Sequence, residues 1–141
     1  LVERLSRDCQ TTSDTETLTA QLQQFVRDYS FIQYVYVTDV KGHSTAIAIS
    51  DPGDQKGYKA FPIGFDYSNR EWFQQPMRTG KLHIMNVHQS QVTGQLIITV
   101  STVITDANDE IIGVLGADIQ LEEIIRRAES LEAEEHIGEE E

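Results

Sequence analysis

Residues 67–73 read Tyr-Ser-Asn-Arg-Glu-Trp-Phe and join a long loop to a predicted short helix over residues 72–79, which Gly80 closes. Arg70 lies among aromatic side chains in this stretch. Its guanidinium is a planar fork of donors that pairs with a carboxylate through two hydrogen bonds, and neighbouring rings can exclude water from such a pair. The stretch therefore predicts a recognition site. The alternative is that its aromatic residues anchor the core and Arg70 is a solvated surface charge.

The residues before this stretch, 51–66, carry two prolines and three glycines and predict a long irregular loop. A loop of this length inside a compact domain is more often functional than decorative. Its glycines lack the spacing to Lys and Ser/Thr that a phosphate-binding loop requires. We therefore expect the loop to cover a pocket of another kind.

Strands are predicted on both sides of this loop, over residues 31–39, 44–49, 82–88, 95–105 and 110–119. Short turns join them, as in an antiparallel sheet. The alternation of side chains places Tyr36 on a hydroxyl-bearing face of the first strand, and Thr99 and Ser101 on the mixed face of the long strand. These faces converge beneath the loop, so the three residues are candidate ligand contacts.

Amphipathic helices are predicted at both ends of the chain. The first covers residues 13–29 and starts at a capping box, Ser13 to Glu16, and the second covers residues 121–135. Together the patterns predict an α+β fold with five antiparallel strands. The terminal helices cover one face of the sheet, and the long loop with the short helix covers the other.

Composition bounds the classes of function. The 141 residues suit one domain, which we place at residues 1–128, with 129–141 as an acidic helix end or tail. The net charge of −12 argues against nucleic acid or an anionic membrane surface as a partner. Cys9 is the one cysteine, which excludes an intrachain disulfide. A chain that opens at Leu1 is expected to be a processed product or a segment of something longer.

Three motifs, in this order, resemble the Cache sensor domains, the PAS-like ligand-binding modules of bacterial receptors. They are Tyr-Val-Tyr-Val-Thr-Asp-x-x-Gly at 34–42, Tyr-x-x-Arg-x-Trp-Phe at 67–73, and Ile-Gly-Val-Leu-Gly-Ala-Asp-Ile at 112–119. The resemblance covers about residues 14–128, with one PAS-like unit instead of two. It implies a five-stranded antiparallel sheet, a ligand pocket beneath the long loop, and no catalysis.

Carried over to this chain, the resemblance implies that Arg70 holds a ligand carboxylate and that Tyr67 and Trp72 line the pocket. Asp118 would face the pocket from the last strand and pair with an amine, or it would cap the closing helix.

Amino-acid-sensing members of the family carry a Tyr five positions before the Arg, a Tyr after the Trp, and an Asp shortly after that. This chain departs from them with Phe65, Phe73 and Gln75 at those places. The departures weigh against an α-amino acid as the ligand.

No other catalytic, metal or cofactor site is predicted. His83 and His88 are five residues apart, so in a regular strand they point to opposite faces and cannot share a metal. No Ser-His-Asp order or close carboxylate pair indicates an active site.

Three readings follow. The first is a sensory domain for a small organic carboxylate or amino-acid-like molecule, which orders the loop and signals through the terminal helices. The second is a dimerisation module without a functional pocket, favoured if Val2, Leu5 and Cys9 form an exposed stripe. The third is a small hydrolase or isomerase using Arg70 and a histidine. For the first we expect the extracytoplasmic part of a membrane receptor, as in chemotaxis, or alternatively a free-standing cytoplasmic protein. A homodimer through the terminal helices is also expected.

Overall fold

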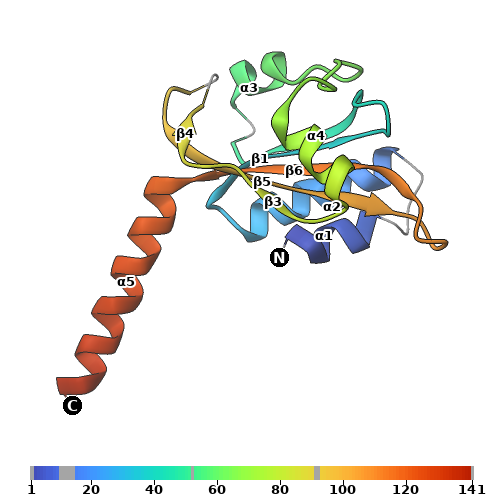
Figure 1. Ribbon diagram of the computed structural model, residues 1–141. Coiled ribbons are helices and arrows are strands. Elements are labelled where there is room, and N and C mark those ends of the chain that lie inside the picture. The colour runs from blue at the N-terminus through green and yellow to red at the C-terminus, as the bar shows by residue number, and fades with distance from the viewer. Residues whose placement is uncertain (1, 10–14, 52, 91–92, 141) are drawn as a thin grey trace.

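The computed structural model describes residues 2–9, 15–51, 53–90 and 93–140. One antiparallel sheet lies between two N-terminal helices and a layer built from loops and short helices (Figure 1). The helices are α1 (Val2–Cys9), α2 (Thr15–Asp28), α3 (Gln55–Ala60), α4 (Glu71–Thr79) and α5 (Leu121–Glu140). The strands are β1 (Ile32–Thr38), β2 (Ser44–Ile49), β3 (His83–Ile84), β4 (His88–Gln89), β5 (Leu96–Thr105) and β6 (Ile111–Gln120). The predicted α+β class is confirmed.

The strand order is β2-β1-β6-β5-β3, and β4 also pairs with β5. The predicted single strand over residues 82–88 is instead the two short strands β3 and β4, so the sheet has six strands in the described part of the chain. The ladder is interrupted because the chain turns locally between them, where Nδ1 of His88 lies 2.8 Å from the carbonyl oxygen of Asn86.

The N-terminal helices cover one face of the sheet. Helix α2 packs on β2 and β1, where its Leu22 and Val26 are buried in one apolar cluster, and α1 packs on β5. Ser6 of α1 donates a hydrogen bond of 2.8 Å to the carbonyl oxygen of Val103, which gives this backbone group of β5 a partner. Val2 is buried, with 7% of its surface exposed.

Two sequence-based expectations at this end fall on residues that the structure does not describe. Ser13 of the predicted capping box lies outside the described residues, as do the side chains of Leu5 and Cys9.

The closing helix departs from the predicted arrangement. We expected α5 to cover the sheet beside α2, but it begins directly after β6 and projects away from the body (Figure 1). Near its start, Arg127 lies over the ring of Phe31, 4.9 Å from the centroid. Of the apolar stripe of α5, Ile125 is 49% exposed and Leu131 is 63% exposed. Since α1 and α2 already occupy that face, the stripe of α5 has no sheet surface left to cover. Within the described residues, no helix is long and apolar enough to cross a membrane.

The other face of the sheet carries α3, α4 and the loops that join them (Figure 1). The predicted irregular loop over 51–66 contains the helix α3, which sequence patterns did not reveal because Gly57 lies inside it. Asp54 caps this helix by accepting a hydrogen bond of 2.8 Å from the Gly57 amide. Its second oxygen accepts one of 2.6 Å from the Tyr34 hydroxyl, which ties α3 to β1. A Cβ atom at Gly57 would lie 2.7 Å from the Tyr34 ring, so this close approach requires glycine.

Candidate ligand-binding site

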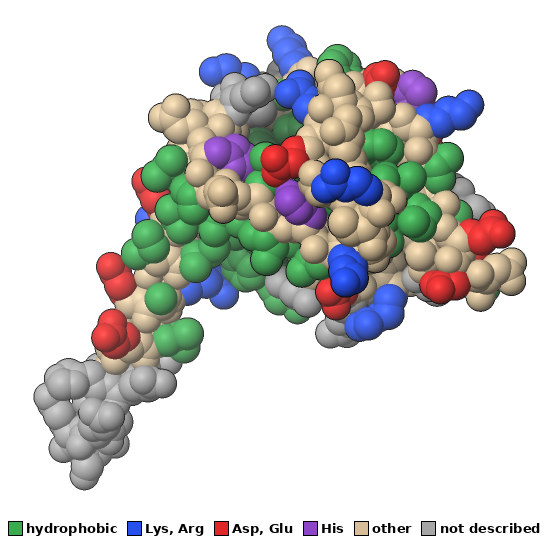
Figure 2. Space-filling view, in the orientation of Figure 1, with side chains coloured by type: hydrophobic (Ala, Val, Ile, Leu, Met, Phe, Trp, Pro, Cys, Tyr) green, Lys and Arg blue, Asp and Glu red, His purple; other side chains and the backbone are tan. Residues whose placement is uncertain are grey.

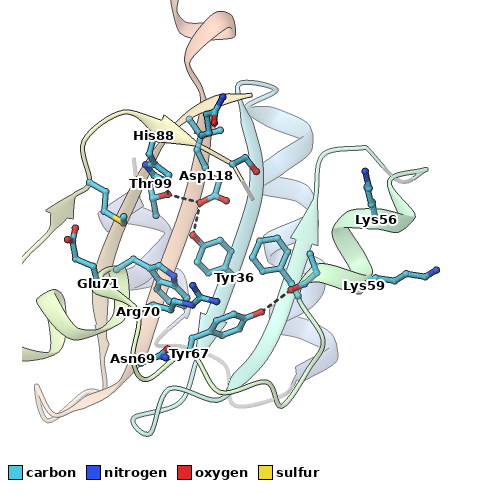
Figure 3. Close-up of a pocket in the computed structure, with 17 residues that line it drawn as sticks. Tyr36, Lys56, Lys59, Tyr67, Asn69, Arg70, Glu71, His88, Thr99 and Asp118 are labelled. Carbon is cyan, nitrogen blue, oxygen red and sulfur yellow. Dashed lines mark hydrogen bonds between the residues drawn. The ribbon is translucent and has the colours of Figure 1, made fainter. Parts of the chain in front are cut away.

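A cavity of about 740 Å³ lies between the sheet and the α3–α4 layer. This volume is typical of small-molecule sites. Its wall is formed by residues from β1, α3, the loop before α4, the start of α4, the β3–β5 region and β6 (Figure 3). The lining residues are Tyr36, Lys56, Lys59, Ala60, Phe61, Tyr67, Asn69, Arg70, Glu71, Trp72, Met85, His88, Gln89, Ser90, Ile97, Thr99 and Asp118.

The carboxyl group of Asp118 is almost fully buried at this wall, with 6% exposure. Its Oδ1 accepts a 2.6 Å hydrogen bond from the Tyr36 hydroxyl and a 3.0 Å bond from the Thr99 hydroxyl. Burial raises the pKa of Asp118, and these two hydrogen bonds lower it in part. No hydrogen bond from a described residue reaches Oδ2, so one oxygen remains available to a ligand.

The Gly-Ala-Asp motif of β6 explains this geometry. Gly116 pairs with Tyr36 across the strands, and a Cβ atom at 116 would overlap the Tyr36 ring. Glycine therefore lets the ring lie flat over β6, where its hydroxyl reaches Asp118 two residues further on. Burial and the neighbouring carboxylate raise the pKa of Tyr36, so its hydroxyl remains a donor.

Arg70 stands at the N-terminus of α4. Its backbone is fixed, because its amide donates to the carbonyl of Tyr67 at 2.9 Å and its own carbonyl accepts from Gln74 at 3.0 Å. Its side chain is exposed and makes no cap hydrogen bond. In the part of the chain that the structure describes, its guanidinium has no carboxylate partner. Figure 3 shows Arg70 and Asp118 on opposite sides of Tyr36.

Four aromatic side chains of the wall contact one another in sequence: Tyr36, Phe61, Tyr67 and Trp72. We call these four residues the aromatic circuit. The centroid distances are 5.3 Å for Tyr36–Phe61, 6.4 Å for Phe61–Tyr67, 5.4 Å for Tyr67–Trp72 and 4.7 Å for Trp72–Tyr36. The circuit gives the cavity an apolar stretch of wall, and the charged side chains of the wall are Lys56, Lys59, Arg70, Glu71 and Asp118.

The structure brings together six of the seven residues proposed from sequence. These are Tyr36, Tyr67, Arg70, Trp72, Thr99 and Asp118, all at the cavity wall.

The seventh, Ser101, is fully buried on the same face of β5, and its hydroxyl has no partner among the described residues. It is not part of the cavity wall, so it can support the site without contacting a ligand. The alternative role of Asp118 was to cap the closing helix. Among the described residues, however, its carboxyl group accepts no hydrogen bond from the α5 backbone, and its Oδ1 accepts from Tyr36 and Thr99 instead.

Among the lining residues that sequence reasoning did not assign, Phe61 and His88 contact residues that it did assign. Phe61 follows α3 and completes the aromatic circuit. The sequence feature that could have indicated it as a lining residue is its position, as an aromatic residue inside the long loop. His88 lies with Nε2 3.4 Å from the Thr99 hydroxyl oxygen. His83 instead pairs with Glu71 at 2.9 Å on the rim.

Comparison with known proteins assigns the class. The chain matches the family model described as the methyl-accepting chemotaxis protein-like, first PDC sensor domain, over residues 15–126. The chain belongs to this family of sensor domains, which confirms the expected Cache-type, PAS-like identity.

Two curated relatives match in sequence. A citrate (Re)-synthase of Syntrophus aciditrophicus is 41% identical over 108 residues, which are 77% of this chain and 17% of that protein. The methyl-accepting chemotaxis protein McpA of Pseudomonas putida is 23% identical over 134 residues, which are 94% of this chain and 19% of McpA. The chain therefore spans less than a fifth of the length of these relatives.

Two solved structures are similar in fold. The ligand-binding domain of the Pseudomonas fluorescens chemoreceptor CtaA, in complex with L-serine, has a TM-score of 0.66 and 24% identity, and the match covers 89% of this chain and 50% of that one. The ligand-binding domain of the Pseudomonas aeruginosa amino acid chemoreceptor PctC, in complex with GABA, has a TM-score of 0.64 and 25% identity, covering 86% and 53%. This chain spans about half the length of those domains.

Proposed function

We propose that this domain binds a small carboxylate or amino-acid-like molecule in the cavity between the sheet and the α3–α4 layer. One observation carries the proposal: Arg70 and Asp118 line the same cavity, and neither the Arg70 guanidinium nor Oδ2 of Asp118 has an ionic or hydrogen-bonding partner among the described residues. A buried carboxylate that lacks a hydrogen bond or an ion pair at one oxygen lowers the stability of the fold. A ligand that supplies the missing partner would explain why the residue is placed there.

Each residue then has a physical role. Arg70 binds the ligand carboxylate through its planar fork, and Asp118 binds a cationic group. Tyr67 and Trp72 exclude water from the ion pairs, and Tyr36 and Thr99 hold Asp118 in position. The ligands bound by CtaA and PctC, L-serine and GABA, each carry a carboxylate and an amine, which supports this assignment.

The signal is proposed to leave through the terminal helices. Asp118 lies on β6 two residues before that strand ends, and α5 begins directly after it. A ligand that pairs with Asp118 and draws α3 and the 51–66 loop against the sheet would favour one position of β6 and hence of α5. No catalytic step is proposed, since the roles assigned to the charged groups at the wall are binding roles.

The family supports a place in the extracytoplasmic part of a membrane receptor, with a free-standing cytoplasmic protein as the alternative. The net charge of −12 disfavours nucleic acid as a partner.

A second candidate function is dimerisation without a ligand. The exposed Ile125 and Leu131 on the projecting α5 favour it, because a second copy of α5 could cover them. A mass that rises with protein concentration in the absence of ligand, and falls in an Ile125→Glu variant, is the result this candidate requires.

A thermal-shift screen of small carboxylates and amino acids tests the proposed function, on the native chain and on Arg70→Ala in parallel. A ligand at about a hundred times its dissociation constant adds roughly 2.7 kcal/mol, or several degrees. Lys41→Ala is the matched control, because Lys41 is an exposed cation outside the cavity wall. Equal shifts in the native chain and Arg70→Ala would reject the role of Arg70.

A further inference from the structure

Three basic side chains line the cavity of an acidic protein. The chain carries 23 acidic and 11 basic residues, but the cavity wall has Lys56, Lys59 and Arg70 against Glu71 and Asp118. Figure 2 shows Lys and Arg side chains gathered over the α3 region at the top of the molecule. Basic side chains around a cleft raise the local concentration of anionic ligands. The wall therefore has the opposite charge balance to the rest of the chain.

The acidic groups of the wall do not pair with the two lysines. Glu71 pairs with His83 at 2.9 Å, and Asp118 is buried on β6, where its hydrogen bonds come from neighbouring strands. Among the described residues, neither Lys56 nor Lys59 forms an ion pair. Both ammonium groups are therefore available to an anion from outside the protein.

The packing of α3 determines which of its faces meets the cavity. Gly57 faces the sheet, since a Cβ atom there would lie 2.7 Å from the Tyr34 ring. With about 3.6 residues per turn, Lys56, Lys59 and Ala60 then share a lateral face of this short helix. All three line the cavity, and both lysines are exposed where they extend from α3 at the rim (Figure 3).

The acidic residue that precedes α3 is engaged within the fold. Oδ1 of Asp54 accepts a hydrogen bond of 2.8 Å from the Gly57 amide, and Oδ2 accepts one of 2.6 Å from the Tyr34 hydroxyl. These bonds hold α3 against β1 and so fix the position of its lysine-bearing face. Lysine side chains keep their ammonium groups in water while their stems lie along the protein surface, which places the two charges at the rim of the cavity.

A zwitterion with a single carboxylate leaves these two charges without a counterpart. In the proposed function the carboxylate binds Arg70 and the cationic group binds Asp118. A cavity of about 740 Å³ is of the size that holds drug-sized ligands, so it has room for a ligand that extends further, to the α3 rim.

We propose that the ligand carries a second acidic group, which binds the ammonium groups of Lys56 and Lys59. The ligand class is zwitterions with two acidic groups, such as acidic amino acids and their β-amino isomers. The second group is a carboxylate or a phosphate, since lysine binds both as a point charge. This inference rests on the proposed function and narrows its ligand.

Isothermal titration calorimetry with matched compounds tests it. Glutamate is compared with glutamine and GABA, each of which has one carboxylate fewer, and aspartate is compared in the same way with asparagine and β-alanine. O-phosphoserine and serine form the pair for a phosphate. In at least one of these sets, the compound with two acidic groups is expected to bind about three- to tenfold more tightly than its partners. Raising NaCl from about 0.02 M to about 0.5 M is expected to reduce this preference, because exposed ion pairs are screened.

A Lys56→Met, Lys59→Met double variant removes both charges and keeps the unbranched stems. Both side chains are exposed, so α3 loses no buried contact. The compound with two acidic groups is expected to bind about three- to tenfold more weakly, while its partner with one acidic group changes by less than about twofold. That second affinity also shows that the cavity is intact. Lys41→Met, at an exposed cation outside the wall, is the matched control and is expected to leave both affinities unchanged.

The outcomes separate the two proposals. Equal affinities for the compounds with one and two acidic groups, in all three sets, would overturn the inference and leave the proposed function standing. A preference for two acidic groups that survives in the double variant would overturn the role of the lysines. No binding of these compounds, together with a hit elsewhere in the carboxylate screen, would also overturn the inference. No binding of any compound would remove the proposed function as well.

Discussion

Replacing Tyr36 by Phe removes a single oxygen atom from the centre of the site. The ring can stay where it is, over Gly116, but Oδ1 of Asp118 loses its 2.6 Å hydrogen bond and retains the 3.0 Å bond from Thr99. A hydrogen bond to a charged acceptor contributes about 1.5 to 3 kcal/mol, and this one is short and buried. We expect the free energy of unfolding at neutral pH to fall by that amount, which lowers Tm by about 5 to 12 °C.

The matched control is Tyr29→Phe. Tyr29 packs against Phe25 on the other side of the sheet, and its hydroxyl bonds to no described residue. Differential scanning calorimetry of the native chain and the two variants at pH 7 gives the comparison. A Tyr36→Phe variant that melts at the same temperature as Tyr29→Phe would refute the reasoning, because the hydrogen bond to Asp118 would then contribute nothing net.

Three further predictions follow from the same contacts. Gly116→Ala forces a methyl group into the Tyr36 ring and is expected to cost about 1 to 3 kcal/mol in urea unfolding, and an unchanged midpoint would contradict the close packing. Burial raises the pKa of Asp118 in the folded state above its ordinary value of 3.8. At pH values between the ordinary pKa and the raised folded-state pKa, the folded state binds more protons than the unfolded state. The free energy of unfolding therefore decreases as the pH rises from the first value to the second. Asp118→Asn is expected to lose this decrease and, at neutral pH, to be at least as stable as the native chain; a steeper loss of stability with rising pH would contradict it. Asp54→Ala removes the cap of α3 and its hydrogen bond to Tyr34 of β1. The free energy of opening of α3, measured by hydrogen exchange, is therefore expected to fall by about 1 kcal/mol or more, while that of α4 stays unchanged. Equal exchange rates for α3 in the variant and the native chain would argue against a role for these two hydrogen bonds.

Much of the sheet side of the site could be predicted from sequence because strand alternation is strict. Tyr36 and Thr99 lie on the cavity wall, as the hydroxyl-bearing faces indicated, and Arg70 lies at the start of α4. Ser101 shares that face of β5 with Thr99 but is fully buried and is not part of the cavity wall, since alternation gives the face of a residue and not what covers it.

The parts that sequence did not predict depend on contacts between distant segments. Helix α3 forms around Gly57, which ordinarily disfavours a helix, because Asp54 is held by Tyr34 on a distant strand. Phe61 completes the aromatic circuit only through this placement. The apolar stripe of α5 predicted a helix correctly, but a stripe does not specify its partner, and Leu131 is exposed.

The most direct measurement for the central claim is calorimetric titration of the tightest ligand from the screen into the native chain, Arg70→Ala and Asp118→Asn. If Arg70 binds the carboxylate and Asp118 the cation, each variant should bind at least about tenfold more weakly, while Lys41→Ala binds as the native chain does. Dissociation constants that are the same in all four proteins would show that the ligand binds elsewhere, and would contradict the assignment of this cavity as the sensory site.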